Sequence, residues 1–258
     1  MIITTAGRVT TDLIQYANEL SFIYQVPYIE RKKQSLNQLK SLYQVDILVV
    51  GKEKLFLSPF KSSDKLFFHL NLAMVRAKRL LNNKEDAFVT AANLEKGMSV
   101  LDCTFGLASD SIIASLVVGE QGVVTGLEAS KAIYMLTSEG LKQTDSSYDS
   151  INEAMRRINV QHAHHLSYLT QQPTNAVDVV YFDPMFQEAI DTSNGLNPIR
   201  QHALHEDLTA EAIEEAKRVA KQRVVIKDYW KSERFQAFGF TQLKRKTALF
   251  HYGIIDVN

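Results

Sequence analysis

Residues 98–128 read MSVLDCTFGLASDSIIASLVVGEQGVVTGLE, and the alternation of patterns within this stretch decides the fold class. The spacing of apolar residues predicts a strand at Ser99–Asp102, a helix at Ser109–Val118 and a second strand at Gly122–Glu128. A strand, a helix and another strand in this order form a βαβ unit, which belongs to a parallel sheet. We therefore predict an α/β fold built on a doubly wound, mostly parallel sheet.

The same alternation continues toward the end of the chain. Ala129–Gly140 has helical spacing, Val177–Phe182 ends in an apolar run typical of a strand covered on both faces, and Arg223–Lys227 predicts a further strand. Phe240–Lys246 and Ala248–Ile255 then predict a closing antiparallel pair, which is a C-terminal hairpin. In such sheets ligands bind at the carboxyl ends of the strands, so polar residues at those ends are the functional candidates.

The first part of the chain follows a different pattern. Helical spacing at Asp12–Tyr24 and Leu66–Leu81 flanks a hairpin that the sequence predicts around Gly51. We therefore predict a small α+β region over residues 1–90, with a possible role in docking a substrate. The parallel-sheet domain is expected over residues 91–258.

The composition excludes several classes of protein. Of the 258 residues, 45% are hydrophobic and 22% are charged, which is typical of a globular chain rather than a disordered or collagen-like one. The longest apolar stretches are far shorter than the roughly 18 residues that a membrane helix needs. The first residues lack the basic and apolar segments of a secretory signal, and the single cysteine, Cys103, cannot form an internal disulfide. We therefore expect a cytoplasmic protein without a membrane segment.

The neutral total charge conceals an asymmetry along the chain. Residues 1–90 carry 13 Lys and Arg against 8 Asp and Glu, whereas residues 91–258 carry 16 against 21. One basic run, Arg31-Lys32-Lys33, is a candidate contact for a polyanion such as nucleic acid. A solvated surface is the ordinary explanation of such a run, so both interpretations stay open.

Polar residues follow the first two predicted strands of the sheet. Beyond Asp102, Gly106 permits the backbone to approach a ligand. Ser109 or Asp110 is then expected to cap the next helix. Glu128 ends the second strand, where a carboxylate is suited to accept both hydroxyls of a ribose. An ordinary strand-to-helix turn and a surface Glu are the alternative interpretation.

Three histidines, His162, His164 and His165, lie at or beyond the end of a short strand predicted near Val160–His164. On a strand His162 and His164 share one face while His165 points away, and no Cys or acidic residue stands at a ligand spacing. We therefore predict no metal site. His164 and His165 are instead candidate contacts for a bound nucleoside, with plain surface histidines as the alternative.

The strongest predicted strand runs into Asp183-Pro184-Met185-Phe186. Pro184 disfavours a helical conformation at Asp183 and has no N–H donor, so this corner is rich in hydrogen-bond acceptors. Acceptors of this kind suit an exocyclic amino group, and Phe186 offers a face on which a base can stack. A strand-terminating turn with a core Phe is the alternative. Lys227, which ends a later strand, is a candidate contact for a substrate phosphate or for Asp183.

With these residues in place, the chain resembles the class I S-adenosylmethionine-dependent methyltransferases. The stretches that narrow the resemblance are Asp102-x-Thr104-x-Gly106-Leu107-x-x-Asp110, Asp183-Pro184-Met185-Phe186 and Arg223–Lys227. They are similar to the family of ribosomal small-subunit RNA guanine-N2 methyltransferases known by the letter J. The resemblance covers roughly Leu66–Val257 and is loose over residues 1–65. It implies a seven-stranded Rossmann-like sheet and methyl transfer from S-adenosylmethionine to the N2 amino group of a guanine in ribosomal RNA.

The resemblance also implies roles for individual residues. The residues expected to bind S-adenosylmethionine are Asp102, Thr104, Gly106, Ser109, Asp110, Glu128, Ala129, His164, His165 and Asp183. The residues expected at the catalytic step are Asp183, Pro184 and Phe186, and those expected to bind RNA are Arg31, Lys32, Lys33, Phe186 and Lys227. Two positions depart from the family's pattern: Ala108-Ser109 stands where it has Gly-Arg, and Gln187 where it has Pro.

Two other functions fit the same residues. The site suits another exocyclic amine, whether of a nucleic acid, a protein or a small molecule. A non-catalytic protein that binds the cofactor or RNA on a methyltransferase scaffold is the other alternative. The intact Asp183-Pro184-Met185-Phe186 argues against that last interpretation, because a site without catalytic activity does not need an acceptor and an aromatic side chain together. A guanine amine of ribosomal RNA is therefore the leading hypothesis.

Overall fold

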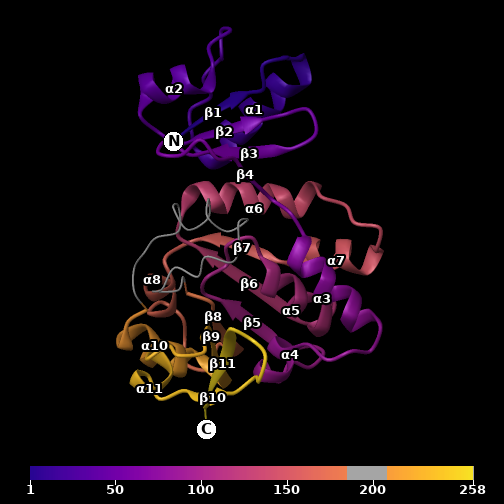
Figure 1. Ribbon diagram of the computed structural model, residues 1–258, viewed down its shortest axis with the longest axis vertical. Coiled ribbons are helices and arrows are strands. Elements are labelled where there is room, and N and C mark those ends of the chain that lie inside the picture. Colours follow the sequence, from indigo (N-terminus) through magenta and orange to yellow (C-terminus); the bar gives the residue numbers. More distant parts are fainter. Residues whose placement is uncertain (185–207, 258) are drawn as a thin grey trace. The chain divides into compact units, whose positions relative to one another are not determined.

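The computed structural model describes residues 1–184 and 208–257, and their contacts divide the chain into two compact units (Figure 1). The first unit comprises residues 1–69 and 130–143. The second comprises residues 70–129, 144–184 and 208–257. The division therefore falls some twenty residues before the boundary expected near residue 90, and it assigns one helix from the middle of the chain to the first unit.

The first unit contains a four-stranded sheet with the strand order β1-β2-β3-β4. Its strands are β1 (Ile2–Thr5), β2 (Ile47–Val50), β3 (Leu55–Ser58) and β4 (Leu66–Phe67), and its helices are α1 (Thr11–Tyr24), α2 (Leu36–Tyr43) and α6 (Lys131–Gln143). Strands β1 and β2 are parallel, and the other neighbours are antiparallel. The hairpin predicted around Gly51 is confirmed, because β2 and β3 pair directly across it.

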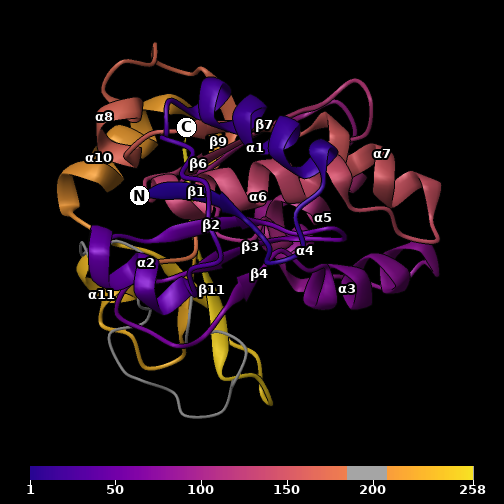
Figure 2. The ribbon, with the colours of Figure 1, turned by 90° about the horizontal axis from the view of Figure 1, so that it is seen from above.

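Packing in the first unit combines an apolar core with one buried carboxylate. Helix α1 lies beside β1 and β2 (Figure 2), and Leu39 of α2 packs against Ile2 and Ile47. Between α1 and α6, Glu139 accepts hydrogen bonds from the hydroxyls of Tyr24 at 2.6 Å and Tyr16 at 2.7 Å. Because Glu139 is buried, these two hydroxyls replace the water that its carboxylate would otherwise need.

The second unit contains a seven-stranded, mostly parallel sheet with the order β10-β11-β9-β8-β5-β6-β7. The strands are β5 (Ser99–Asp102), β6 (Val123–Glu128), β7 (Asn159–His162), β8 (Val177–Phe182), β9 (Ala220–Tyr229), β10 (Thr241–Leu243) and β11 (Phe250–Asp256). Strands β5 to β9 are parallel, and β11 pairs antiparallel with both β9 and β10. The predicted fold class and its C-terminal hairpin are confirmed.

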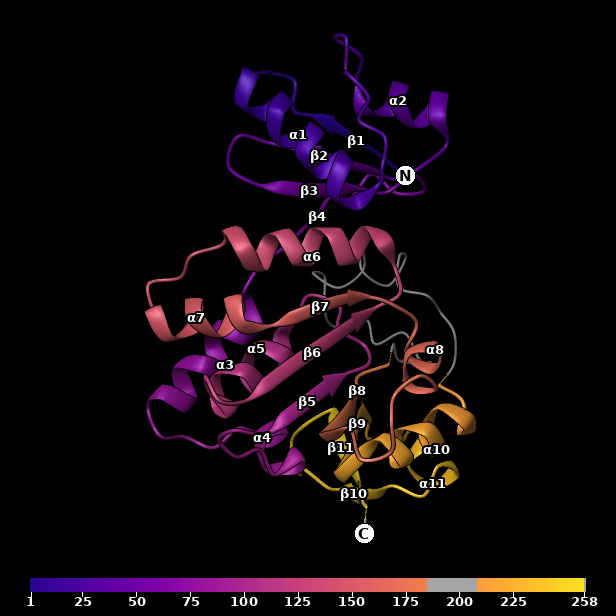
Figure 3. The same ribbon diagram turned by 180° about the vertical axis from the view of Figure 1, so that it is seen from behind.

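Helices cover both faces of this sheet, as Figures 1 and 3 show. One face carries α3 (Asn71–Leu81), α4 (Ala87–Ala92), α5 (Ser109–Val118) and α7 (Asp149–Arg157), and the other carries α8 (His165–Leu169), α10 (Ala210–Val219) and α11 (Arg234–Ala237). The central strand β8 is apolar on both sides for this reason. Its Phe182 packs in the core beneath α10, whereas Tyr181 contacts Phe88 of α4 with ring centroids 4.5 Å apart.

One element prediction was wrong, and one predicted strand ends earlier than expected. Leu66–Leu81 is not one helix: Leu66 and Phe67 form β4, paired with Leu57 and Phe56 of β3, and α3 begins only at Asn71. Hydrogen bonding of these two apolar residues to the free edge of β3 outweighs the helical spacing of the sequence. The strand near Val160–His164 ends at His162, because His164 caps the short helix α8.

Candidate functional site

The loop after β5 is shaped from within the core by Asp102. The Asp102 carboxylate accepts hydrogen bonds from the Thr104 backbone N–H at 3.0 Å and from the Ser111 hydroxyl at 2.6 Å. Burial raises the pKa of Asp102 to about 7, although both hydrogen bonds favour the ionised form. Asp102 therefore fixes the course of the loop at the carboxyl end of the first strand of the sheet.

The loop turns at Gly106, beside Glu128. Gly106 has φ +53°, and the space where a Cβ would stand meets only the Thr104 carbonyl oxygen, at 3.9 Å. The backbone here is thus open to a ligand. Glu128, at the end of β6, accepts the Gly106 N–H at 3.0 Å. The structure thereby brings together Gly106 and Glu128, two candidates that follow different strands. The carbonyl oxygen of Ala129, next to Glu128, lies 3.1 Å from Nε2 of His162.

Helix α5 begins in an unusual way. Its N-cap is Ala108, with φ +63°, and no side chain caps it. The expectation that Ser109 or Asp110 caps this helix is therefore wrong. Asp110 is bound elsewhere, and the uncapped N–H groups leave a partial positive charge at the helix start, which suits an anionic group such as a carboxylate.

A chain of charged side chains runs from the end of β8 toward α3. The ammonium of Lys227 lies 2.6 Å from the Asp183 carboxylate and 3.4 Å from that of Asp110. Arg76 of α3 binds the other oxygen of Asp110 at 2.6 Å and pairs with Asp86, with its Nε 2.8 Å from the carboxylate. All five side chains are largely or wholly buried, so each charge depends on its partners.

The protonation of this chain follows from burial and from the alternation of charge. Burial works against the charge of Lys227, but Asp110 and Asp183 outweigh it and raise the pKa of the ammonium. Burial also raises the pKa of Asp183, an effect that Lys227 opposes and Asp110 reinforces. At Asp110 burial is overcome by Lys227 and Arg76, which hold its pKa at about 2. Asp110 is thus the fixed anion, and Asp183 is the carboxylate more ready to take a proton.

Asp183 is also tied to the loop after β5. Its backbone N–H donates to the Thr104 hydroxyl at 2.6 Å, which joins the end of β8 to the loop that Asp102 and Gly106 shape. The following Pro184 is buried and supplies no N–H. The carboxyl ends of β5, β6 and β8 therefore present one continuous group of acceptors. Phe186, and with it the predicted stacking face, lies outside the described residues.

The two histidines beyond β7 lie next to this group of strands. The rings of His164 and His165 are 4.2 Å apart, and His165 meets Phe182 of β8 edge to face at 5.8 Å. Burial, reinforced by His164, lowers the pKa of His165 to about 4, so its imidazole is neutral near pH 7. Across residues 1–184 and 208–257, no three His, Cys, Asp or Glu side chains are grouped to hold a metal ion.

The basic run of the first unit is a surface turn. Lys32 and Lys33 are exposed and both have positive φ, whereas Arg31 donates from Nε to the Gln34 carbonyl at 2.7 Å. Sequence reasoning missed the roles of Arg76 and Asp86, because nothing in their local pattern distinguishes them from surface residues of α3 and the following turn. Their signal is the buried Asp110, which needs a cation from outside its own βαβ unit.

Comparison with known proteins decides the family. A model of the family described as "Putative SAM-dependent methyltransferase" matches residues 32–246. The chain belongs to this family. The prediction of a class I methyltransferase is therefore confirmed, and the family implies S-adenosylmethionine as the cofactor.

Similar proteins differ in how much of their sequence they share with this chain. The chain is 46% identical over its full length, and that of the relative, to "Uncharacterized protein YpiP" of Bacillus subtilis. It is 33% identical to "Ribosomal RNA small subunit methyltransferase J" of Marinobacter nauticus over 50% of this chain and 46% of the relative. A crystal structure of a SAM-dependent methyltransferase from Neisseria gonorrhoeae shares the fold with TM-score 0.65 and 17% identity, covering 100% of this chain and 96% of that one.

The residues present fit S-adenosylmethionine. The open space beside Gly106 admits a ligand against the backbone, and the uncapped start of α5 suits the carboxylate of its methionine part. Glu128 supplies carboxylate oxygens suited to ribose hydroxyls at the adjoining strand end.

Among the described residues, no helix is both long and apolar enough to cross a membrane.

Proposed function

We propose that this protein transfers a methyl group from S-adenosylmethionine to the N2 amino group of a guanine in ribosomal RNA. The observation that carries the proposal is the carboxylate of Asp183, which stands at the end of β8 while its own N–H is bound to the cofactor loop through Thr104. An amino group needs such an acceptor beside the methyl donor. The names of the relatives in Marinobacter nauticus and Psychrobacter cryohalolentis support ribosomal RNA as the substrate.

Asp183 orients the amino group and receives its proton. S-adenosylmethionine supplies an electrophilic methyl group on a sulfonium, so the protein's task is chiefly to position the nitrogen in line with it. The Asp183 carboxylate accepts an N–H of the amine, which localises the nitrogen lone pair. Because burial raises the pKa of Asp183, its carboxylate is a better acceptor for the proton that leaves once the methyl is transferred. Lys227 fixes the carboxylate at 2.6 Å.

The cofactor-binding roles are part of the same proposal. We assign the ribose to Glu128 and Ala129, and the methionine part to the loop Asp102–Asp110. The neutral imidazole of His165, with His164 beside it, is assigned to the nucleoside base. Phe186 stays a prediction for stacking of the target guanine.

A separate contact is assigned to the first unit. Lys32 and Lys33 expose their ammonium groups on a surface turn, and we propose that they, with Arg31, bind phosphates of the RNA. Such contacts add affinity without reading the sequence.

The test is mass spectrometry of nucleosides from small-subunit ribosomal RNA of cells with and without the gene. N2-methylguanosine is expected to decrease in the deletion strain and to return when the wild-type gene is restored, but not when Asp183→Asn is restored. Unchanged N2-methylguanosine would refute the assignment. Loss of a different methylated nucleoside would move the reaction to another exocyclic amine.

A further inference from the structure

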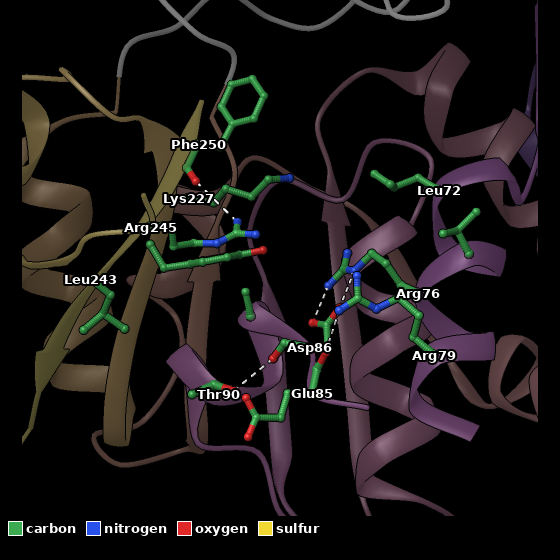
Figure 4. Close-up of a pocket in the computed structure, with 13 residues that line it drawn as sticks. Leu72, Arg76, Arg79, Glu85, Asp86, Thr90, Lys227, Leu243, Arg245 and Phe250 are labelled. Carbon is green, nitrogen blue, oxygen red and sulfur yellow. Dashed lines mark hydrogen bonds and ion pairs between the residues drawn. The ribbon is translucent and has the colours of Figure 1, made fainter. Parts of the chain in front are cut away.

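A cleft of about 630 Å³ opens in the second unit beside Lys227 (Figure 4). One wall comes from α3 and the segment around α4, and the opposite wall comes from the β10–β11 hairpin. The cleft does not include the loop Asp102–Asp110 or Glu128, so it is distinct from the cofactor residues. It meets the reaction site through Lys227, which is bound to Asp183 at 2.6 Å, and the start of α5 through Arg76, which is bound to Asp110 at 2.6 Å.

Two arginines at this cleft have no carboxylate partner among the described residues. Arg79 on α3 and Arg245 on the hairpin are exposed and come from opposite walls (Figure 4). Their contacts in the described parts of the chain are long ones to backbone carbonyls, 3.4 Å each to Glu85 and Phe250, and neither guanidinium forms an ion pair there. Arg76, deeper in the cleft, is by contrast fully neutralised. Two guanidinium forks facing one cleft suit a phosphate, because each offers paired N–H donors.

Part of the cleft wall is apolar. Leu72 and Val75, one turn apart on α3, line the cleft although these residues are 53% and 59% exposed, and Phe250 lies on the hairpin side. Exposed apolar side chains inside a cleft indicate a ligand with an apolar or planar face. A nucleobase has such a face. Apolar wall and guanidinium groups together match a nucleotide better than they match an inorganic anion.

The hairpin that carries Arg245 is braced from behind. The Gln242 side-chain amide lies 2.9 Å from Nδ1 of the buried His251, and Nε2 of the same ring lies 3.0 Å from the Arg245 carbonyl oxygen. The Arg245 backbone N–H also lies 3.2 Å from Nε2, so this ring nitrogen meets both the N–H and the carbonyl of Arg245. A turn held in this way positions Arg245 before any ligand arrives, which reduces the entropy lost on binding.

We propose that this cleft seats the RNA strand next to the target guanine: Arg79 and Arg245 bind a phosphodiester, and Leu72, Val75 and Phe250 contact a neighbouring base. The inference rests on the proposed function, since it takes RNA as the substrate. The positions of the charged groups along the cleft agree with that function. The acceptor Asp183 lies one ion pair beyond the inner end of the cleft, whereas the unpaired cations lie at the exposed walls, so a strand can place phosphate outward and an amino group inward.

The test measures binding of a short, fluorescein-labelled, guanine-containing RNA by anisotropy over a series of salt concentrations. Arg79→Ala with Arg245→Ala is expected to weaken binding about tenfold or more. The slope of log K against log salt should fall by about one for each phosphate contact removed. S-adenosylmethionine affinity by calorimetry and the melting temperature should stay at wild-type values. Lys96→Ala is the charge control, because Lys96 is an exposed cation before β5 that does not line the cleft.

Three results would overturn the inference. One is wild-type RNA affinity and salt slope in the double variant. Another is an equal loss in Lys96→Ala, which would mean that total charge and not the cleft attracts RNA. The last is unchanged RNA binding together with lost binding of polyglutamate, which would make the cleft an acidic-peptide site.

The proposed function fails separately. If the RNA nucleosides of the deletion strain are unchanged while the double variant still loses RNA binding, the cleft stands and the reaction is wrong. If N2-methylguanosine disappears in the deletion strain but the double variant binds RNA normally, the reaction stands and the cleft assignment is wrong.

Discussion

At the scale of single residues, Asp183 carries the chemical step that we propose. Asp183→Asn keeps the size and one acceptor but removes the charge that polarises the amine, so we expect single-turnover methyl transfer to fall about a hundredfold or more. S-adenosylmethionine affinity should change little. The matched control is Asp178→Asn on the same strand, whose carboxylate braces Ser99 at the other end of β8. That change should lower the melting temperature and leave the rate of methyl transfer unchanged. A wild-type rate in Asp183→Asn would mean that Asp183 only ends the strand and takes no part in the reaction.

Glu128 tests the cofactor assignment. Glu128→Ala removes the oxygens assigned to the ribose hydroxyls and the acceptor of the Gly106 N–H. Affinity for S-adenosylmethionine, measured by calorimetry, should therefore fall by about 1–3 kcal/mol. Glu120→Ala removes an exposed carboxylate from the turn before β6 and serves as the charge control. Equal affinities of the two variants would exclude Glu128 from the cofactor site.

Residue predictions from sequence depended on strand ends. Asp102, Glu128 and Asp183 are candidates because each stands at the end of an apolar run, and a parallel sheet gathers such ends at one edge. The partners Arg76 and Asp86 were not found, since they come from a helix and a turn before the sheet begins. No local spacing indicates a long-range ion pair of this kind.

At the scale of elements, the close approach of β6 to the loop after β5 is a point of high sensitivity. A Cβ at Gly126 would stand 2.0 Å from the Phe105 ring, far inside contact distance. We expect Gly126→Ala to lower the free energy of unfolding by about 1–3 kcal/mol and to weaken cofactor binding, because Phe105 directly precedes Gly106.

Phe105→Leu provides the test of this cause. If the clash with the ring is responsible, the double variant should lose less stability than the sum of the two single changes, as denaturant unfolding measures. Additive losses would point to a different origin, such as a change in the β6 backbone itself.

Strand and helix predictions succeeded where one periodicity dominated. β5, α5 and β8 have the bounds that the sequence predicted, because most of their residues are buried. The Leu66–Leu81 prediction was wrong because its apolar residues serve two purposes: Leu66 pairs with β3, and only the later part is helical. β1 escaped sequence analysis altogether, since Ile2–Thr5 is short and its parallel partner β2 lies more than forty residues away.

At the scale of the whole molecule, the charge asymmetry of the sequence runs roughly along the division into units. The basic excess was counted over residues 1–90, whereas the contacts place residues 70–90, with Arg76 and Arg79, in the second unit. Arg76 is neutralised there, whereas Arg79 forms no ion pair within the described parts of the chain. Net charge along the chain therefore leaves a polyanion partner and a solvated surface both open, whereas the ion pairs show which cations are already neutralised.

The acid stability of the second unit tests its central ion pairs. Lys227 and Arg76 hold the pKa of Asp110 at about 2, below the roughly 3.9 of an unfolded Asp. This carboxylate thus adds about 2–3 kcal/mol of stability above about pH 4, which is lost as the pH falls toward 2, because the unfolded chain takes up the proton first.

Denaturant unfolding at each pH, followed by fluorescence of the single Trp230, reports on this unit. Asp110→Asn should be less stable at pH 7 and should lose less stability between pH 4 and pH 2 than wild type, whereas Asp145→Asn, which removes an exposed carboxylate, should follow the wild-type curve. A wild-type pH slope in Asp110→Asn would mean that other carboxylates govern acid unfolding.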